Sequence, residues 1–194
     1  PNSKLIYYRT YVEKQGWKNY VTDGKSSGTV GESKKLEGIS IRLSSGIDGT
    51  VQYRTYTEND GWETWSENGE INGKPDGTRR LEAIRIRLTG EAAEKYDIYY
   101  RVHCQDEGWL GWAKNGEKAG SEGYSRRMEA IEIRLVKKGE KTPETGGKSF
   151  LVNTSTNLVS YNTYVEGQGW TNYVTDGRLS LIHISEPTRP LYIS

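Results

Sequence analysis

Short stretches of alternating hydrophobic and polar residues recur along the chain. Successive side chains of an extended strand point to opposite sides, so every second residue of such a stretch would share one face. The positions expected to face inward are Ile6, Tyr8, Thr10 and Val12, then Val51, Tyr53, Thr55 and Thr57, then Ile98, Tyr100, Val102 and Cys104. Gly, Asn-Gly and Asp-Gly separate the stretches, and no segment has helical spacing. The pattern predicts antiparallel strands joined by tight turns.

The alternating stretches belong to a tandem repeat that is marked by a Gly-Trp dipeptide. The tryptophans of the four dipeptides are Trp17, Trp62, Trp109 and Trp170, and the first three lie about 45 residues apart. A tyrosine-rich run precedes each mark, as YYRTYVEKQGW, QYRTYTENDGW, YYRVHCQDEGW and SYNTYVEGQGW. An aromatic residue follows three positions after each tryptophan, and an Asp-Gly or Asn-Gly turn comes next. The first three copies close with KKLEGISIRL, RRLEAIRIRL and RRMEAIEIRL.

Each complete copy is expected to form three strands: the tyrosine-rich run, the segment from Gly-Trp to the turn, and the closing run. The inward positions of the closing run are Ile39, Ile41 and Leu43, then Ile84, Ile86 and Leu88, then Ile131, Ile133 and Leu135. A unit of about 45 residues cannot bury a core alone, so neighbouring repeats must share one.

The four frames resemble the ChW repeat, the clostridial hydrophobic repeat with Trp of Gram-positive bacterial surface and secreted proteins. The resemblance covers residues 5–43, 51–88 and 98–135 in full and residues 158–177 in part, because the tyrosine run, Gly-Trp, the turn and the closing run occur in this order. It implies an exported protein, located outside the cell or at its surface, with repeats grouped in threes. It also implies binding of carbohydrate or of other surfaces, with no established ligand.

The predicted fold is all-β, with three antiparallel three-stranded repeats closed around a pseudo-threefold axis as a β-prism or trefoil-like body. Closure would leave few exposed sheet edges. The alternative is a set of propeller-like blades. Residues 1–136 would form this module, residues 137–157 are polar and contain Pro and Gly as in a linker, and residues 158–178 would be a truncated fourth repeat.

The two ends of the chain do not fit the repeat pattern. Residues 179–194 contain neither the turn nor the closing run, and LSLIHISEPTR at 179–189 resembles the translation of a transposase-type sequencing adapter. We therefore expect this tail to be a library artefact. The chain begins at Pro1 without Met, so the natural N-terminus is expected to lie further upstream.

Composition narrows the classes of partner. Lys and Arg number 27 against 26 Asp and Glu, which argues against nucleic acid because neutralising its backbone needs a basic excess. No run approaches the roughly 20 apolar residues of a membrane span. The aromatic residues are mainly Tyr, at 14, and Trp, at 6, which suit half-wet surfaces because each ring has an apolar body and a polar edge.

The aromatic residues supply the candidate ligand-binding groups. Strand parity predicts that Trp17, Trp62 and Trp109 fill the core, while Tyr20, Trp65 and Trp112 face outward. An outward ring could stack on the apolar face of a sugar, or it could pack against the adjacent repeat. The flanking groups that could bind sugar hydroxyls are Arg9, Arg54 and Arg101, with Tyr11, Tyr56 and His103.

One glutamate in each complete repeat begins the closing run. Glu37, Glu82 and Glu129 have the parity of the following isoleucines, which predicts that each carboxylate faces inward. A buried carboxylate needs partners, and backbone N–H groups, a Trp indole or an Arg could provide them. The alternative is a hydroxyl acceptor at the rim of each repeat. A glycosidase needs two carboxylates with separate roles, so one repeated Glu favours a structural or binding part.

No other constellation predicts catalysis. His103 has no second histidine or cysteine cluster to complete a zinc site, and Cys104 is expected to fill the core. The sequence predicts no cofactor and no metal. It indicates a non-catalytic binding module of an exported bacterial protein, which recognises a glycan or cell-surface polymer. The alternatives are an adhesion or scaffolding module for a protein partner, and an accessory region of a larger secreted hydrolase.

Overall fold

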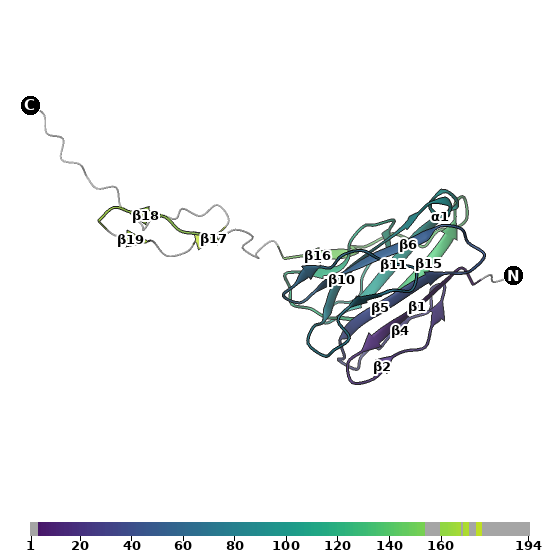
Figure 1. Ribbon diagram of the computed structural model, residues 1–194, viewed down its shortest axis with the longest axis horizontal. Coiled ribbons are helices and arrows are strands. Elements are labelled where there is room, and N and C mark those ends of the chain that lie inside the picture. Colours follow the sequence, from purple (N-terminus) through teal and green to yellow (C-terminus); the bar gives the residue numbers. More distant parts are fainter. Residues whose placement is uncertain (1–3, 154–159, 168, 171–173, 176–194) are drawn as a thin grey trace, which may run out of the picture. The chain divides into compact units, whose positions relative to one another are not determined.

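The computed structural model describes residues 4–153, 160–167, 169–170 and 174–175. The chain divides into two compact units, Pro1–Asn153 and Thr154–Ser194. The first unit contains the three complete repeats (Figure 1). The tail at 179–194, interpreted as adapter sequence, lies outside the described residues.

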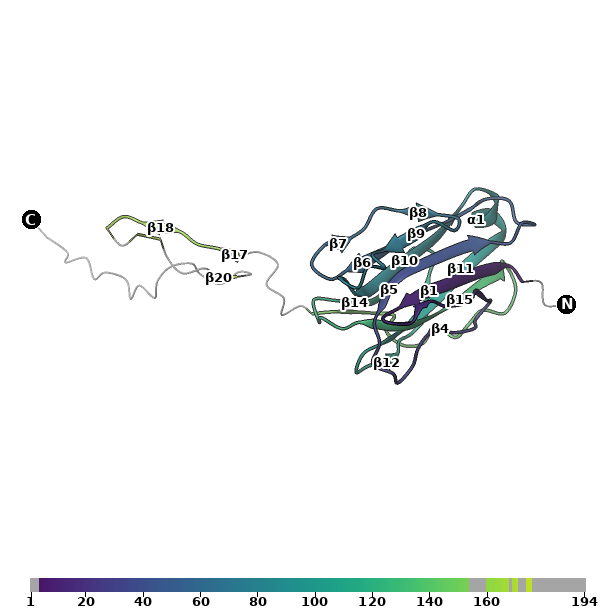
Figure 2. The same cartoon turned by 60° about the horizontal axis from the view of Figure 1, so that its bottom comes forward.

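A pair of long antiparallel strands forms the centre of each repeat (Figure 2). The pairs are β1 (Ile6–Val12) with β5 (Leu36–Leu43), β6 (Thr50–Thr57) with β10 (Leu81–Thr89), and β11 (Tyr96–Cys104) with β15 (Met128–Lys137). Along β1 and β6, buried and half-buried residues alternate as predicted, because one face packs on the shared core, whereas in β11 Tyr99 is also buried.

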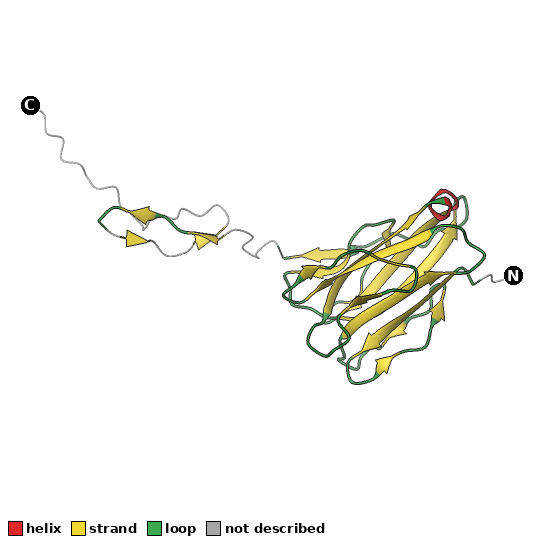
Figure 3. Ribbon diagram, viewed as in Figure 1, coloured by secondary structure: helices red, strands yellow, loops and turns green. Residues whose placement is uncertain are grey.

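Shorter strands extend each pair on the side of the first long strand. The Gly-Trp marks form β2 (Gly16–Trp17), β7 (Gly61–Trp62) and β12 (Gly108–Trp109), and the turn-side strands are β3 (Val21–Thr22), β8 (Ser66–Glu67) and β13 (Ala113–Lys114). Each of these pairs with the first long strand of its own repeat. The described part of the first unit is therefore almost entirely strand and turn, as Figure 3 shows, and the predicted all-β class is confirmed.

The three repeats exchange strands in a ring. The exchanged strands are β4 (Ser27–Gly28), β9 (Ile71–Gly73) and β14 (Ala119–Glu122). Strand β9 of the second repeat pairs with β5 of the first, β14 of the third pairs with β10 of the second, and β4 of the first pairs with β15 of the third. Every repeat thus depends on its neighbour for a strand, and the third is joined to the first. The finer description as a β-prism or trefoil stays a prediction.

Three glycines make this exchange possible. Gly28, Gly73 and Gly120 have φ angles of +119°, +97° and +116°, which L residues rarely adopt. A Cβ at Gly120 would clash with the carbonyl oxygen of Glu82 and would lie 2.6 Å from Cα of Ala83. The exchanged strand can approach its neighbour this closely only because the side chain is absent.

Three buried tyrosines also join the repeats through the core. The hydroxyl of Tyr8 accepts a hydrogen bond from Ile133 N at 3.0 Å, and that of Tyr53 accepts one from Ile41 N at 3.1 Å. The hydroxyls of Tyr8, Tyr53 and Tyr100 also donate to the carbonyls of Lys25, Glu70 and Glu117. Burial raises the pKa of all three phenols, that of Tyr53 to about 12. The core therefore contains polar groups whose hydrogen bonds are satisfied between repeats.

Two elements were not predicted from the sequence. A short helix, α1 (Glu91–Lys95), connects β10 to β11, although no helical spacing was recognised there. Strand β16 (Phe150–Val152) lies in the segment interpreted as a linker and pairs in parallel with β14. After the third repeat, the chain therefore adds one more strand to the sheet that contains β14.

The described part of the second unit consists of short paired strands. They are β17 (Ser160–Tyr161) with β20 (Val174–Thr175), and β18 (Tyr164–Val165) with β19 (Gly169–Trp170). Tyr164 lies opposite Trp170, as Tyr11 lies opposite Trp17 in the first repeat. Among the described residues, no helix is long and apolar enough to cross a membrane.

Candidate functional site

Aromatic rings and arginine side chains stack alternately on the outer face of the second repeat. The Arg54 guanidinium lies between two tryptophans, with Cζ 5.2 Å from the ring centroid of Trp62 and 4.9 Å from that of Trp65. The Cζ of Arg87 lies 4.1 Å from the Trp65 ring. These distances are those of cation–π contacts, which align the planar cation and the ring.

The other two repeats have the same arrangement. In the first repeat, Arg9 lies 4.7 Å from the rings of both Trp17 and Tyr20, and Arg42 lies 4.6 Å from Tyr20. In the third repeat, Arg101 lies 5.0 Å from Trp109 and 4.8 Å from Trp112, and Arg134 lies 5.4 Å from Trp112. We call these stacks the aromatic–arginine ladders. Their members are Trp17, Arg9, Tyr20 and Arg42; Trp62, Arg54, Trp65 and Arg87; and Trp109, Arg101, Trp112 and Arg134.

A further ring closes one end of each ladder. Tyr11 packs edge-on against Trp17 with ring centroids 5.5 Å apart and an angle of 83° between the ring planes. The equivalent contacts are Tyr56 with Trp62 at 5.6 Å and His103 with Trp109 at 5.5 Å. The two residues of each pair lie directly opposite each other on adjacent antiparallel strands, β1 and β2, β6 and β7, or β11 and β12. The nine predicted ligand-binding residues are thus brought together as three sets of three, one set on the outer face of each repeat.

The prediction that Trp17, Trp62 and Trp109 fill the core is wrong. Each stacks on the same arginine as the aromatic residue three positions later, so both rings are on the outer face, and all six are half-buried. The Gly-Trp strand has only two residues, and the chain leaves the strand before β8 begins at Ser66. Strand parity therefore does not carry from one aromatic residue to the next.

The repeated glutamates are buried beside an Arg or a backbone N–H, as predicted, but they do not face the core. In the first repeat, Tyr11 lies opposite Gly38 and Val12 opposite Leu36, so Glu37 is the additional residue of a β-bulge. The bulge interrupts alternation, so Leu36 and Ile39 reach the core while the carboxylate between them does not join it. The same irregularity occurs at Glu82 and Glu129.

Each glutamate lies at the rim of its ladder, mostly buried and beside a cation. Glu82 Oε1 is 2.8 Å from Arg80 Nε, and burial raises the pKa of this carboxyl. Glu129 Oε1 is 2.9 Å from Arg127 Nη2, and its Oε2 is 3.0 Å from His103 Nδ1. In the first repeat the partners of Glu37 are Lys35 Nζ at 3.3 Å and the backbone N–H of Gly77 at 3.2 Å. These carboxylates are held by cations and backbone rather than by a Trp indole.

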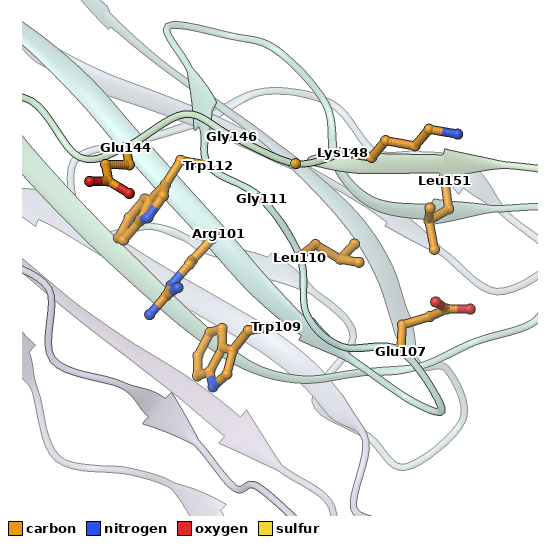
Figure 4. A pocket seen from close by; sticks show the side chains of 11 residues that line it. Arg101, Glu107, Trp109, Leu110, Gly111, Trp112, Glu144, Gly146, Lys148 and Leu151 are labelled. Carbon is orange, nitrogen blue, oxygen red and sulfur yellow. The ribbon is translucent and has the colours of Figure 1, made fainter.

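Two hollows lie beside the ladders. The larger, about 610 Å³, is lined by Trp109, Arg101 and Trp112 and by residues 144–148 that precede β16. Figure 4 shows Arg101 between the two tryptophans and Glu144 beside Trp112. The other hollow, about 330 Å³, is lined by Tyr11, Glu37 and residues 75–77 of the next repeat. Both are open grooves with aromatic, cationic and carboxylate groups together.

The thiol of Cys104 and the imidazole of His103 are enclosed by neighbouring side chains. Cys104 is buried, and burial raises the pKa of its thiol to about 12, so it is protonated at neutral pH. His103 lies against Trp109 and Glu129. Among the described residues, no group of three or more His, Cys, Asp or Glu side chains could hold a metal ion.

The model of the Clostridial hydrophobic W (ChW) family matches residues 11–45, 56–90 and 103–137, more than half of the chain. This chain belongs to the ChW family. Neither a curated protein nor a solved structure matches it significantly. Each matched ChW segment begins at the ring that closes a ladder, at Tyr11, Tyr56 or His103. The ladder arginines Arg9, Arg54 and Arg101 lie just before the matched segments.

The second arginine of each ladder was missed by the sequence interpretation. Arg42, Arg87 and Arg134 occupy the same position in the closing runs ISIRL, IRIRL and IEIRL of the ChW repeats. Their parity is opposite to that of the buried isoleucines, so the repetition of Arg at this outward position was the signal that could have identified them.

Proposed function

We propose that this ChW module binds a carbohydrate or a cell-surface polymer without catalysis. The observation that carries the proposal is the threefold recurrence of the aromatic–arginine ladder on the outer surface. Half-exposed rings can stack on the apolar C–H face of a pyranose, and the adjacent Arg, Tyr, His and Glu groups can donate to or accept from its hydroxyls.

The repetition itself suits a polymer. One open groove with a few polar groups would hold a sugar weakly, but three ladders on one body can engage several units of the same chain. Binding at the second and third ladders then becomes intramolecular, and the overall affinity exceeds that of any single ladder. A repetitive ligand, such as a wall or mucus polysaccharide, fits this arrangement.

The features that recur in all three ladders support a non-catalytic role. Only one glutamate, engaged by a cation, recurs at the rim of all three ladders, whereas glycoside hydrolysis needs two carboxylates with different protonation flanking one bond. We further propose that the parent protein is exported and acts outside the cell or at its surface, as membership of the ChW family favours. The same mixture of Trp, Tyr and Arg also suits a protein partner, which is the second candidate.

A glycan array with the 194-residue chain tests the proposal. The double variant Trp65→Ala with Trp112→Ala should lose saturable glycan binding by about tenfold or more, because two stacking platforms are removed. Tyr124→Ala is the matched control, since Tyr124 is an exposed ring that contacts Arg126 outside the ladders. Circular dichroism and thermal unfolding would verify that all variants fold.

The outcomes separate the candidates. Equal binding by the double variant and the control would remove the ladders as the binding surface. Capture of a host protein with no glycan bound would favour the adhesion role, and release of sugar by the purified chain would contradict the non-catalytic role.

A further inference from the structure

The three ladders differ in charge at one position on their outer face. Directly opposite the ladder arginine in the paired long strand is Ser40 in the first repeat, Arg85 in the second and Glu132 in the third. Both ladder arginines recur in every repeat, so this position changes the charge beside them from one repeat to the next.

In the third repeat the ladder arginine is neutralised within the protein. Arg101 Nε donates to Glu132 Oε2 at 2.8 Å, and the two groups form an ion pair. In the first repeat Ser40 is uncharged, and its Oγ donates to the carbonyl of Gly69 at 2.8 Å.

In the second repeat three cations lie together without an anionic partner. Arg54, Arg85 and Arg87 form no ion pair with any carboxylate of the described residues, and the buried Nε of Arg54, like that of Arg9 in the first repeat, has no hydrogen-bond partner among them. Burial, followed by the charges of Arg85 and Arg87, lowers the pKa of Arg54. Glu67 lies opposite Gln52 and accepts a hydrogen bond from its side-chain Nε2, while Gln52 Oε1 accepts one from Arg87 Nε at 2.8 Å, so Gln52 separates this carboxylate from Arg87.

We propose that Arg54, Arg85 and Arg87 form an anion subsite on the second ladder, which takes a carboxylate, sulfate or phosphate substituent of a sugar chain. The inference rests on the proposed function and deepens it. Guanidinium groups bind such planar or tetrahedral oxyanions through paired N–H donors. The sugar ring would stack on the aromatic residues as in the other ladders, while the acidic substituent would bind preferentially at the second repeat, where three arginines lie together.

The chain contains its own template for the test variant. Arg85 Nε donates to the carbonyl of Gly116 at 2.7 Å, and Ser40 makes the equivalent bond to Gly69 in the first repeat. Arg85→Ser therefore removes the charge while the inter-repeat hydrogen bond can be retained. Lys141→Ser is the control, because it removes the same charge from an exposed side chain outside the ladders.

Binding would be measured with two matched polymer pairs: polygalacturonate with its methyl ester, and dextran sulfate with dextran. We expect the unmodified chain to bind an acidic polymer about tenfold or more tightly than its neutral counterpart, because charge-assisted hydrogen bonds are added. Arg85→Ser should lose most of this preference and keep its affinity for the neutral polymer, whereas Lys141→Ser should keep the preference. If Arg85→Ser fails to fold, Arg87→Gln should reduce the preference by about fivefold.

Several results would overturn the subsite. The first is an unchanged preference for acidic polymer in both Arg85→Ser and Arg87→Gln, and the second is an equal loss of this preference in Lys141→Ser. The third is equal binding of acidic and neutral polymers by the unmodified chain, and the fourth is that it binds none of the four polymers. Ladder-dependent binding on the glycan array would still support the proposed function in each of these cases, so the two failures are distinguishable.

Discussion

The second and third repeats share the same strand arrangement and differ in a buried pair of side chains and in one charge on the outer face. Both contribute an exchanged strand with a glycine of positive φ, and both bury a tyrosine that bonds to the neighbouring turn. Inside, the contact of Thr55 with Asn72 in the second repeat is replaced by Val102 and Ala119 in the third. Outside, Arg85 is replaced by Glu132.

The buried differences occur as matched changes, whereas the outer change from Arg85 to Glu132 is single because its cross-strand partner is Arg in both repeats. A polar residue on β6 has a polar partner on β9, and an apolar residue on β11 stands where the equivalent residue on β14 is also apolar. The repeats therefore share the features that close the ring, while each satisfies its own buried polar groups. Features common to the repeats should be costly to change, whereas paired features should be exchangeable.

The largest effect is expected at the glycine of the exchanged strand. Gly120→Ala should destabilise the fold by more than about 3 kcal/mol, because the added Cβ meets backbone atoms of β10 and the φ angle is strained. Urea unfolding followed by fluorescence would measure the loss. Gly139→Ala is the control: Gly139 has φ of +90° with nothing within 4 Å, so only about 1 kcal/mol is expected. An equal loss of stability in Gly120→Ala and Gly139→Ala would mean that close approach to β10 is not the reason for glycine at position 120.

The next effect concerns the shared buried tyrosines. Because the pKa of Tyr53 is raised to about 12 in the folded chain, the folded state keeps a proton that the unfolded state releases near pH 10. The free energy of unfolding should therefore fall as pH rises from 10 to 12, by roughly 2–3 kcal/mol for this residue. Urea midpoints at pH 9 and pH 12 would measure the fall, which should be smaller in Tyr53→Phe. A fall of the same size in that variant would rule out Tyr53 as its source.

The sequence was sufficient for the strands and the repeats. Period-two alternation placed Tyr8, Tyr53 and Tyr100 correctly on the inner face, because long strands preserve parity over many residues. The exchange of β4, β9 and β14 was not foreseen. Pairing between repeats depends on the close backbone approach at Gly28, Gly73 and Gly120. In the sequence these three glycines do not stand out from the many other glycines of the turns.

Parity failed where strands are short or irregular. The Gly-Trp strands have two residues, and the bulges at Glu37, Glu82 and Glu129 add one residue opposite the partner strand. Parity counted back from the isoleucines fails across each bulge, which misplaced the glutamates, and parity does not carry from a two-residue strand to the next one, which misplaced the tryptophans. The ladders could be anticipated as clusters of aromatic residues and arginines, but the stacking order requires three dimensions.

A smaller effect is expected when the polar pair of the second repeat is broken. Asn72→Ala leaves the hydroxyl and N–H of Thr55 without their acceptor and should cost about 2 kcal/mol. Adding Thr55→Val reproduces the Val102 and Ala119 pair of the third repeat, so the double variant should recover about 1 kcal/mol. Urea unfolding of both single variants and the double variant measures the coupling. Strict additivity of the two changes would show that the repeats do not exchange this pair.

The smallest effect is expected at Cys104, where the three repeats offer both the substitution and its control. The equivalent residues are Val12 and Thr57, and the hydroxyl of Thr57 donates to Glu63 at 3.1 Å. In the third repeat Leu110 stands in place of Glu63, so a hydroxyl at position 104 would lack this partner. Cys104→Val should change the free energy of unfolding by less than about 0.5 kcal/mol, whereas Cys104→Thr should cost about 1 kcal/mol more. If threonine proved as stable as valine in urea unfolding, the matching of buried side chains within each repeat would not extend to this position.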